Sequence, residues 1–386
     1  MRATIVRGIQ LLVLITLAVS AWFAYDSVHR QHVALGAGFA DLRLGWLAIG
    51  AVLALQEGVF GGLRIWVLGR VLSKELRLRT AIISEFVLMF AGGVTPGQAG
   101  APPAQIAVLV NGGMRFLDAS TAELLTALCT VTFFLVTAIV VFVLGHDGRL
   151  VLAPGAHLDG LLGLSVVTFG AAFVALILCG ARPEVLRAAV RVIAPALSLV
   201  TRSAARALSY VPLLRERMTR RLARPDRGRE RMLAFVDDMH RGFMIYWRRG
   251  KVALLVAQVL TFGFFLSRFA VAYCVIRGLG LSTTPDRFVA IGSPIVQIVL
   301  VQAVLNFALY LSPTPGASGI AEAGASTLMS PWLKGPYELA YIALWRFLSL
   351  FLCMFVGGVY VFRYLGTDVL EKRIAENEAA AAESRG

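Results

Sequence analysis

Long apolar runs are the feature that most constrains this chain, because they recur along nearly its whole length. A helix needs about 18–20 apolar residues to cross a bilayer. Of the 386 residues, 58% are hydrophobic, whereas soluble domains average about 45–50%. We therefore expect an all-α polytopic membrane protein with about six full spans. The runs that reach this length cover residues 8–25, 44–69, 124–145, 160–180, 252–276 and 339–362.

The N-terminal run, 8–25, could also be a cleavable signal peptide, since Ala18-Val19-Ser20 is a passable cleavage pattern. We prefer an uncleaved first helix, because the apolar run continues through Trp22 and Phe23. Either interpretation leaves residues 26–43 outside.

Positive charge orients the spans. The net charge is +14, and residues 181–251 hold 17 Lys and Arg against 6 acids. Such a segment is typical of a cytoplasmic loop that obeys the positive-inside rule. Docking of the same segment on anionic lipid head groups is compatible with this interpretation, whereas no aromatic platform supports nucleic-acid binding. The rule predicts an inner-membrane protein with both termini in the cytoplasm and residues 146–158 outside.

Two helix-breaking strings stand inside this apolar background. Residues 92–105 read GGVTPGQAGAPPAQ and residues 312–324 read SPTPGASGIAEAG, so both contain T-P-G-x-[AS]-G. Broken backbone at membrane depth is tolerated only when it is buried in protein or lines a wet cavity. The arms around the first string, 80–94 and 102–112, are too short to span at about 1.5 Å per residue.

We therefore expect two re-entrant broken-helix hairpins. The arms of the second would be residues 288–311 and 319–332, although the first of these is long enough to span fully. Span, hairpin and span would then occur twice in opposite senses, which is the inverted-topology repeat that many transporters use. This plan divides the chain into residues 1–43, 44–145 (first repeat), 146–250 (fifth span and arginine-rich segment), 251–365 (second repeat) and 366–386 (polar tail).

Each hairpin restarts a helix after its break, and a helix N-terminus attracts anions. Two such ends near the midplane would form a receptor for an anionic head group. The alternative is that both loops are packed hairpin tips, since small residues also suit close helix packing.

Charges within the spans are costly, so they usually face a cavity or pair with one another. Structural ion pairs and snorkelling side chains remain alternatives for each. We expect Arg64 and Glu85 to lie near the membrane interface, and Arg268, Glu322 and Arg346 to lie deeper. Glu322 should stand in the first turn of its half-helix and orient Arg346 or Arg268 rather than contact the ligand. The candidate substrate-binding residues are Thr95, Gly97, Gly100, Gln105, Glu123, Arg268, Ser312, Thr314, Gly316, Ser318, Gly319, Glu322 and Arg346.

Other site chemistry finds no support in the sequence. The four cysteines lie in apolar runs without a CxxC pair, which indicates that they are small apolar residues of helices. All five histidines fall in predicted loops. No Walker A string is present. We expect no catalytic residue, no metal and no cofactor.

The string SPTPGASGIAEAG followed by LWRFLSLF resembles the flippase-like transmembrane domain of lysylphosphatidylglycerol synthases and their stand-alone relatives. The stretch GGVTPGQAGAPPAQIAVLVNGG resembles the first hairpin of the same family, and the resemblance covers residues 44–365. Many relatives carry an acidic residue and an arginine just after the first T-P-G, where this chain has Pro102 and Gln105. The resemblance implies movement of an anionic phospholipid or lipid-linked anion between leaflets. The aminoacyl-transferase domain of the larger relatives has no counterpart here, so that activity is not expected.

Four functions remain open from the sequence. They are lipid translocation, an integral-membrane transferase acting on a lipid-linked donor, a small-solute permease, and a membrane scaffold that docks through residues 181–251. The sequence does not fix the oligomeric state.

Overall fold

The computed structural model describes residues 39, 42–146, 159–184, 187–188, 191, 228–282, 294–333 and 337–363. The expected first span at residues 8–25, the polar tail from residue 366 and most of the arginine-rich segment lie outside these described residues. Within the described ranges every regular element is helical and none is a strand. The chain is an all-α polytopic membrane protein.

Four described helices are long and apolar enough to cross a membrane. They are α2 (Leu44–Leu72), α5 (Phe116–His146), α10 (Lys251–Gly278) and a C-terminal helix from Tyr337 to Arg363. The last begins as α13 (Tyr337–Arg346) and continues through a π-helical turn, η4 (Phe347–Phe351). A further apolar helix, α6 (Asp159–Ala181), packs against α5. These helices coincide with the apolar runs at 44–69, 124–145, 160–180, 252–276 and 339–362.

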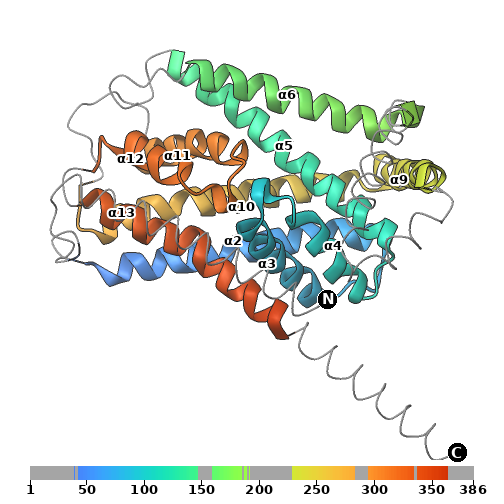
Figure 1. The fold of residues 1–386 in the computed structure, drawn as a ribbon, viewed down its shortest axis with the longest axis horizontal. Coiled ribbons are helices and arrows are strands. Elements are labelled where there is room, and N and C mark those ends of the chain that lie inside the picture. Colours follow the sequence, from blue (N-terminus) through green and yellow to red (C-terminus); the bar gives the residue numbers. More distant parts are fainter. Residues whose placement is uncertain are drawn as a thin grey trace, which may run out of the picture.

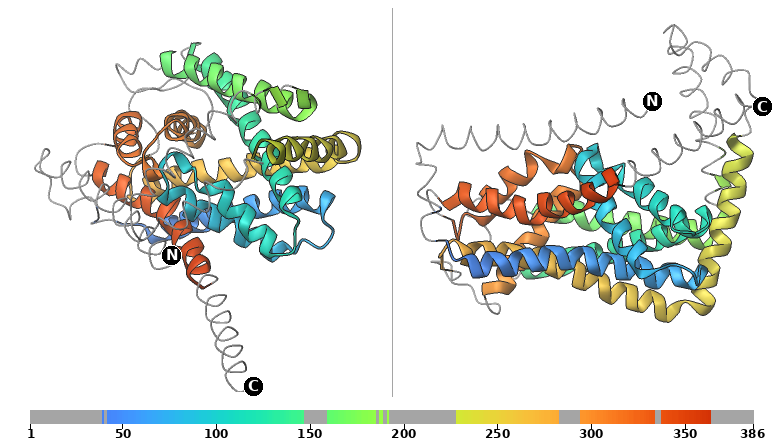
Figure 2. Two further views of the ribbon diagram at one scale, coloured as in Figure 1. Left: turned by 45° about the vertical axis from the view of Figure 1, so that its right-hand side comes forward. Right: turned by 90° about the horizontal axis from the view of Figure 1, so that it is seen from below.

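The centre of the bundle is the helix pair α2 and α10, which run side by side along the long axis (Figures 1 and 2). Helix α3 (Leu78–Val94) comes close to α2 because α2 carries glycine where the two helices meet. A Cβ on Gly61 would lie 2.3 Å from the Glu85 carboxyl carbon, and one on Gly62 would lie 2.5 Å from the Ile82 Cα. Small residues permit such close helix contacts in membranes. Glycine on α2 therefore lets Glu85 reach the interior.

Two broken hairpins flank this central pair. The first consists of α3 (Leu78–Val94), the short turn η2 (Pro96–Gln98) and α4 (Ala101–Asn111). The second consists of α11 (Pro294–Tyr310), η3 (Pro315–Ala317) and α12 (Ile320–Met329).

Each hairpin breaks at the proline of its T-P-G string. Thr95 and Thr314, each directly before a proline, have extended backbone with ψ of 141° and 150°, as the proline ring requires of its predecessor. In Figure 1 the two hairpins lie toward opposite ends of the bundle, and η2 contacts η3 near its middle. The two T-P-G strings, more than two hundred residues apart in the sequence, therefore meet in space.

Helix α9 (Gly228–Arg249) was not predicted from the sequence. It runs across one end of the bundle, roughly perpendicular to the long helices (Figure 2). Its apolar face buries Val236, Phe243 and Tyr246. The Tyr246 hydroxyl donates to the Leu68 carbonyl, and burial raises the pKa of this hydroxyl above its ordinary range, which keeps it a donor. The helix closes the end of the bundle at which α2 ends and α10 begins.

Candidate functional site

The two T-P-G loops share an uncommon backbone conformation. Gly97 and Gln98 have φ of 56° and 57°, and Gly316 and Ala317 have φ of 57° and 54°. Left-handed backbone is costly for residues with a side chain, so two consecutive left-handed residues at the same place in both loops mark a specific turn. The string thus predicts local geometry in both halves of the chain.

A buried clamp holds the second loop. The Arg346 Nε lies 3.0 Å from Glu322 Oε1, and the Arg346 Nη2 donates to the Gly316 carbonyl at 2.9 Å. The other Glu322 oxygen accepts the backbone N–H of Gly319 at 2.6 Å. Glu322 thus stands in the first turn of α12, as expected. It contacts Arg346, one of the two arginines that the sequence analysis offered as its partner. Both side chains are less than a tenth exposed.

Hydroxyl groups complete the second loop. Thr314 Oγ1 donates to the Ser318 carbonyl at 2.9 Å and lies 2.8 Å from Ser312 Oγ. Ser318 Oγ donates to the Pro315 carbonyl at 3.0 Å. These side chains bond to the loop itself, so they shape the loop rather than line open space.

The first loop has fewer contacts. Thr95 Oγ1 donates to the Ala91 carbonyl at 2.7 Å and accepts the Gly100 N–H at 2.9 Å. Pro102 and Pro103 then occupy the start of α4 and lack N–H groups. Consequently α4 offers fewer N-terminal donors to an anion than an ordinary helix.

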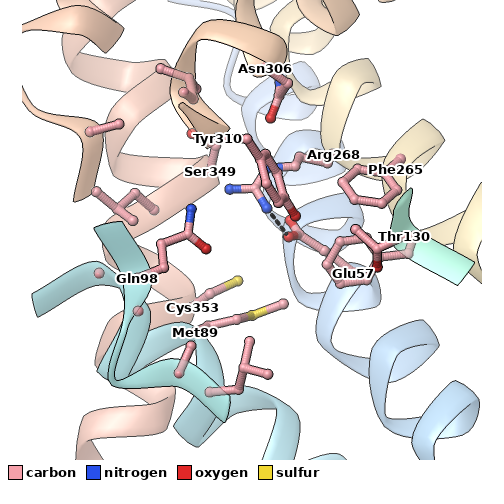
Figure 3. Close-up of a pocket in the computed structure, with 18 of the residues that line it drawn as sticks. Glu57, Met89, Gln98, Thr130, Phe265, Arg268, Asn306, Tyr310, Ser349 and Cys353 are labelled. Carbon is pink, nitrogen blue, oxygen red and sulfur yellow. Dashed lines mark hydrogen bonds and ion pairs between the residues drawn. The ribbon is translucent and has the colours of Figure 1, made fainter. Parts of the chain in front are cut away.

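Arg268 forms the central ion pair. Its Nη1 lies 2.8 Å from Glu57 Oε1, which joins the middle of α10 to the middle of α2. The Arg268 side chain is 27% exposed, whereas Glu57 is 2% exposed. Figure 3 shows this pair at the pocket, with Tyr310 from α11 beside the guanidinium.

Arg64 and Glu85 form a third pair, with 3.5 Å between Arg64 Nη2 and Glu85 Oε1. Arg64 also donates to Thr130 Oγ1 at 3.2 Å and lies over the Phe264 ring at 5.0 Å. Gln105 donates to Glu85 Oε2 at 2.8 Å. Arg64 and Glu85 are 4% and 0% exposed, so both side chains point into the protein and neither snorkels to its surface. That they lie near the membrane interface stays a prediction.

These groups surround a cavity of about 380 Å³ that both halves of the chain line. Five predicted site residues border it: Gly97, Glu123, Arg268, Gly316 and Arg346. Eight others lie behind its wall: Thr95, Gly100, Gln105, Ser312, Thr314, Ser318, Gly319 and Glu322. The second set supports the lining residues through the hydrogen bonds above, or shapes the turns.

Several residues of the cavity were not among the predicted site residues. Glu57, Gln98 and Tyr310 all line it, and Gln98 extends its amide into the open space (Figure 3). Glu57 was recognisable as an intramembrane acid, but its partner is 211 positions away. Gln98 is the variable residue of the T-P-G-x-[AS]-G string, so the string itself marked its place.

Among the described residues, no group of three or more His, Cys, Asp or Glu side chains could hold a metal ion. The cavity lining includes arginine and glutamate side chains, one tyrosine and residues of the two broken hairpins.

Comparison with known proteins places this arrangement in a family. The family model described as the lysylphosphatidylglycerol synthase TM region matches residues 9–357. No curated protein and no solved structure matches the chain. The family match spans the α2–α10 pair, both hairpins and Arg346. The chain belongs to the lysylphosphatidylglycerol synthase TM-region family.

Proposed function

We propose that this protein translocates a phospholipid or lipid-linked anion between leaflets, with the head group in the cavity and the acyl chains in the surrounding lipid. The observation that carries this proposal is the partly exposed Arg268 in a cavity lined by both halves of a membrane bundle. Charged side chains inside a membrane protein usually mark a substrate pathway. Family membership supports a role in lipid handling.

Arg268 is the best candidate for the phosphate contact. A guanidinium has five N–H donors, and the described residues accept one of them, through Glu57. The other two cavity arginines are more enclosed, with side chains 5% exposed for Arg64 and 7% exposed for Arg346. Arginine pairs well with phosphate because its planar donors match the phosphate oxygens.

The two hairpins supply the moving parts of this proposal. Their tips meet at the cavity from opposite ends of the bundle, which is how re-entrant hairpins of an inverted-topology repeat would be arranged. Under the positive-inside rule, α9 and the residues before it face the cytoplasm, and the first hairpin enters from that side. Exposure of the cavity to one side and then the other would move the head group.

The helix N-termini play a smaller part than the arginines in this scheme. Two prolines remove donors from the start of α4, and Glu322 already accepts the Gly319 N–H at α12. A carboxylate at that position competes with an anionic ligand for the same end of the helix. The phosphate contact therefore falls to Arg268 in this proposal.

A small-solute permease is the second candidate. A volume of about 380 Å³ lies within the roughly 300–1,000 Å³ that small-molecule pockets occupy. Transport of glycerol phosphate, which is a head group without acyl chains, distinguishes the two functions. A permease would carry it, and a lipid translocase would not.

The test uses the full chain reconstituted in phosphatidylcholine vesicles that carry a small share of fluorescent phosphatidylglycerol. We expect faster loss of inner-leaflet fluorophore to an external quencher than in protein-free vesicles. The double variant Glu57→Gln/Arg268→Gln removes both charges of the central pair, so it leaves no unpaired buried charge. We expect it to lose most of this lipid exchange. Arg187→Gln is the matched control, because Arg187 pairs with Asp237 away from the cavity. Exchange no faster than in empty vesicles would refute lipid translocation, and uptake of free glycerol phosphate would favour the permease.

A further inference from the structure

The charged groups around the cavity do not balance. Three arginines, Arg64, Arg268 and Arg346, line it, and each has one glutamate partner within 4 Å. The partners are Glu85, Glu57 and Glu322. Glu123 also lines the cavity and is in none of these pairs. With all seven side chains ionised, three positive charges face four negative charges, so the described residues of this site sum to −1.

Glu123 lies on α5 and has no ion-pair partner among the described residues. Its Oε2 atom is buried and has no hydrogen-bond partner among the described residues. The charged groups that act on it are Glu85, from α3, which disfavours its negative charge, and Arg64, from α2, which favours it. Arg64 is already bound to Glu85 and Thr130, so Glu123 shares this base with another carboxylate.

Among the described side chains, no ion pair joins Glu123 to the other helices that pack against α5, which are α4, α6, α9, α10 and α11. Helix α4 carries no titratable side chain, no described side chain of α6 is titratable, and the only titratable side chain that α11 contributes to the cavity lining is Tyr310. On α10 the charged lining residue is Arg268, which pairs with Glu57. On α9, Asp237 pairs with Arg187, His240 contacts the Gly180 carbonyl and Tyr246 donates to the Leu68 carbonyl.

A buried carboxylate without a partner is costly as an anion and much less costly as a neutral acid. An entering phosphate adds another negative charge to the same space, so binding further favours the neutral form. We propose that Glu123 takes up one proton when an anionic head group enters the cavity, so that lipid movement is coupled to a proton. In this step a hydronium ion of the solvent gives one proton to a Glu123 carboxylate oxygen, so one O–H bond of hydronium breaks, one O–H bond forms on Glu123, and a water molecule is released. This inference rests on the proposed lipid function and names its ion coupling.

Proton and lipid must then favour each other's binding by the same factor. Lipid binding becomes tighter as the pH falls, because protonation removes a negative charge from the site. The dissociation constant should change by up to about tenfold per pH unit on the alkaline side of the Glu123 titration, as expected for uptake of one proton.

The test is calorimetric titration of the full chain, in neutral detergent micelles, with short-chain phosphatidylglycerol. Wild-type protein should take up close to one proton per lipid bound, read from the dependence of the binding heat on the ionisation enthalpy of the buffer. Glu123→Gln is a permanently neutral stand-in for the protonated acid, so it should bind at all pH values as the wild type does at low pH. Asp118→Asn, five positions earlier on the same helix and outside the cavity lining, should keep the pH dependence of the wild type.

Each possible result overturns or supports a defined part of the proposal. Equal pH dependence in wild type and Glu123→Gln would overturn the assignment to Glu123. Tight wild-type binding without proton uptake would overturn the coupling while leaving the lipid function intact. Absence of binding at every pH would overturn both the proton coupling and the proposed lipid function. The proton count uses wild-type protein alone, so the coupling is testable even if the Glu123 variant fails to fold.

Discussion

The two T-P-G loops have nearly the same string and the same left-handed pair of residues, yet the protein holds them differently. In the second loop Ala317 and Ser318 are buried, and Arg346 and Glu322 bond to its backbone. In the first loop Gln98 is exposed to the cavity, and among the described residues the loop's side-chain bonds all run through Thr95.

The difference shows what a short string can and cannot determine. Proline and glycine set the local break in both hairpins through sterics alone. The clamp on the second loop comes from an arginine 30 positions later and has no counterpart in the first hairpin. Counting from the shared string, the place of Glu322 is taken by Pro103, which has neither a carboxylate nor an N–H. The second loop is therefore held by more side-chain contacts than the first loop.

The largest expected effect comes from breaking the clamp. Arg346→Ala leaves the Glu322 carboxylate buried without its partner, and loss of one member of a buried pair costs about 3–5 kcal/mol. We expect a marked drop in thermal stability in detergent and loss of head-group binding. Thermal unfolding followed by a cysteine-reactive dye, together with the vesicle exchange assay, measures both.

A double-mutant cycle tests whether the pair acts as a unit. Glu322→Gln alone should keep the fold but disturb Arg346, and the double change should be little worse than Arg346→Ala alone. Additive losses would mean that the two residues act independently, and the second loop would then not be held by a clamp.

The next effect concerns the last glycine of each string. Gly319 has φ of 88° and ψ of −56°, a combination that residues with a Cβ avoid, so Gly319→Ala should cost about 1–3 kcal/mol. Gly100 has φ of −79°, and its added Cβ would lie 2.7 Å from the Thr95 side chain, with the Ala91 carbonyl oxygen at an ordinary contact distance of 3.4 Å. Gly100→Ala should therefore cost less, because a side chain can move where backbone cannot. Equal melting temperatures of the two variants would contradict a difference in backbone between the loops.

A smaller effect is expected from the loop threonines. Thr95→Val removes the acceptor for the Gly100 N–H, and one lost hydrogen bond costs about 1 kcal/mol. Hydrogen exchange at Gly100 should accelerate in this variant. In Thr314→Val the N–H of Gly319 should remain protected, because Glu322 is its acceptor. Accelerated exchange at Gly319 would show that the second loop depends on Thr314 as the first depends on Thr95.

Much of this architecture was readable from the sequence. Apolar runs predicted the long helices, and the proline and glycine strings predicted both breaks. Glu322 was predicted to stand in the first turn after the break, and Arg346 was one of the two arginines named as its partner. These predictions succeeded because they depend on local backbone chemistry or on the cost of charge in an apolar run.

Other features depend on which helices touch, and hydropathy does not carry that information. The specific pair of Arg64 and Glu85 was not predicted, because it depends on the glycines of α2 that let α3 pack closely. The Glu57–Arg268 pair joins two spans 211 positions apart. Helix α9 was missed because its arginines dominated the interpretation, although Val236, Phe243 and Tyr246 recur at helical spacing.

The smallest expected effect on stability separates the two loops most cleanly. Gln98 and Ala317 occupy the same place in the two strings and have nearly the same φ. Gln98→Ala therefore gives the first loop the residue of the second without a change in backbone strain. Because Gln98 is exposed, the free energy of unfolding should change by no more than about 0.5 kcal/mol.

Binding should respond even though stability does not. The Gln98 amide points into the cavity (Figure 3) and has no hydrogen-bond partner of its own among the described residues. An amide that donates to a charged phosphate contributes about 1.5–3 kcal/mol, so Gln98→Ala should weaken head-group binding by roughly tenfold or more. The calorimetric titration and a melting curve on the same preparation give the two readouts. If affinity stays unchanged, the first loop is a packed hairpin tip like the second; if stability falls instead, the amide supports the loop rather than the ligand.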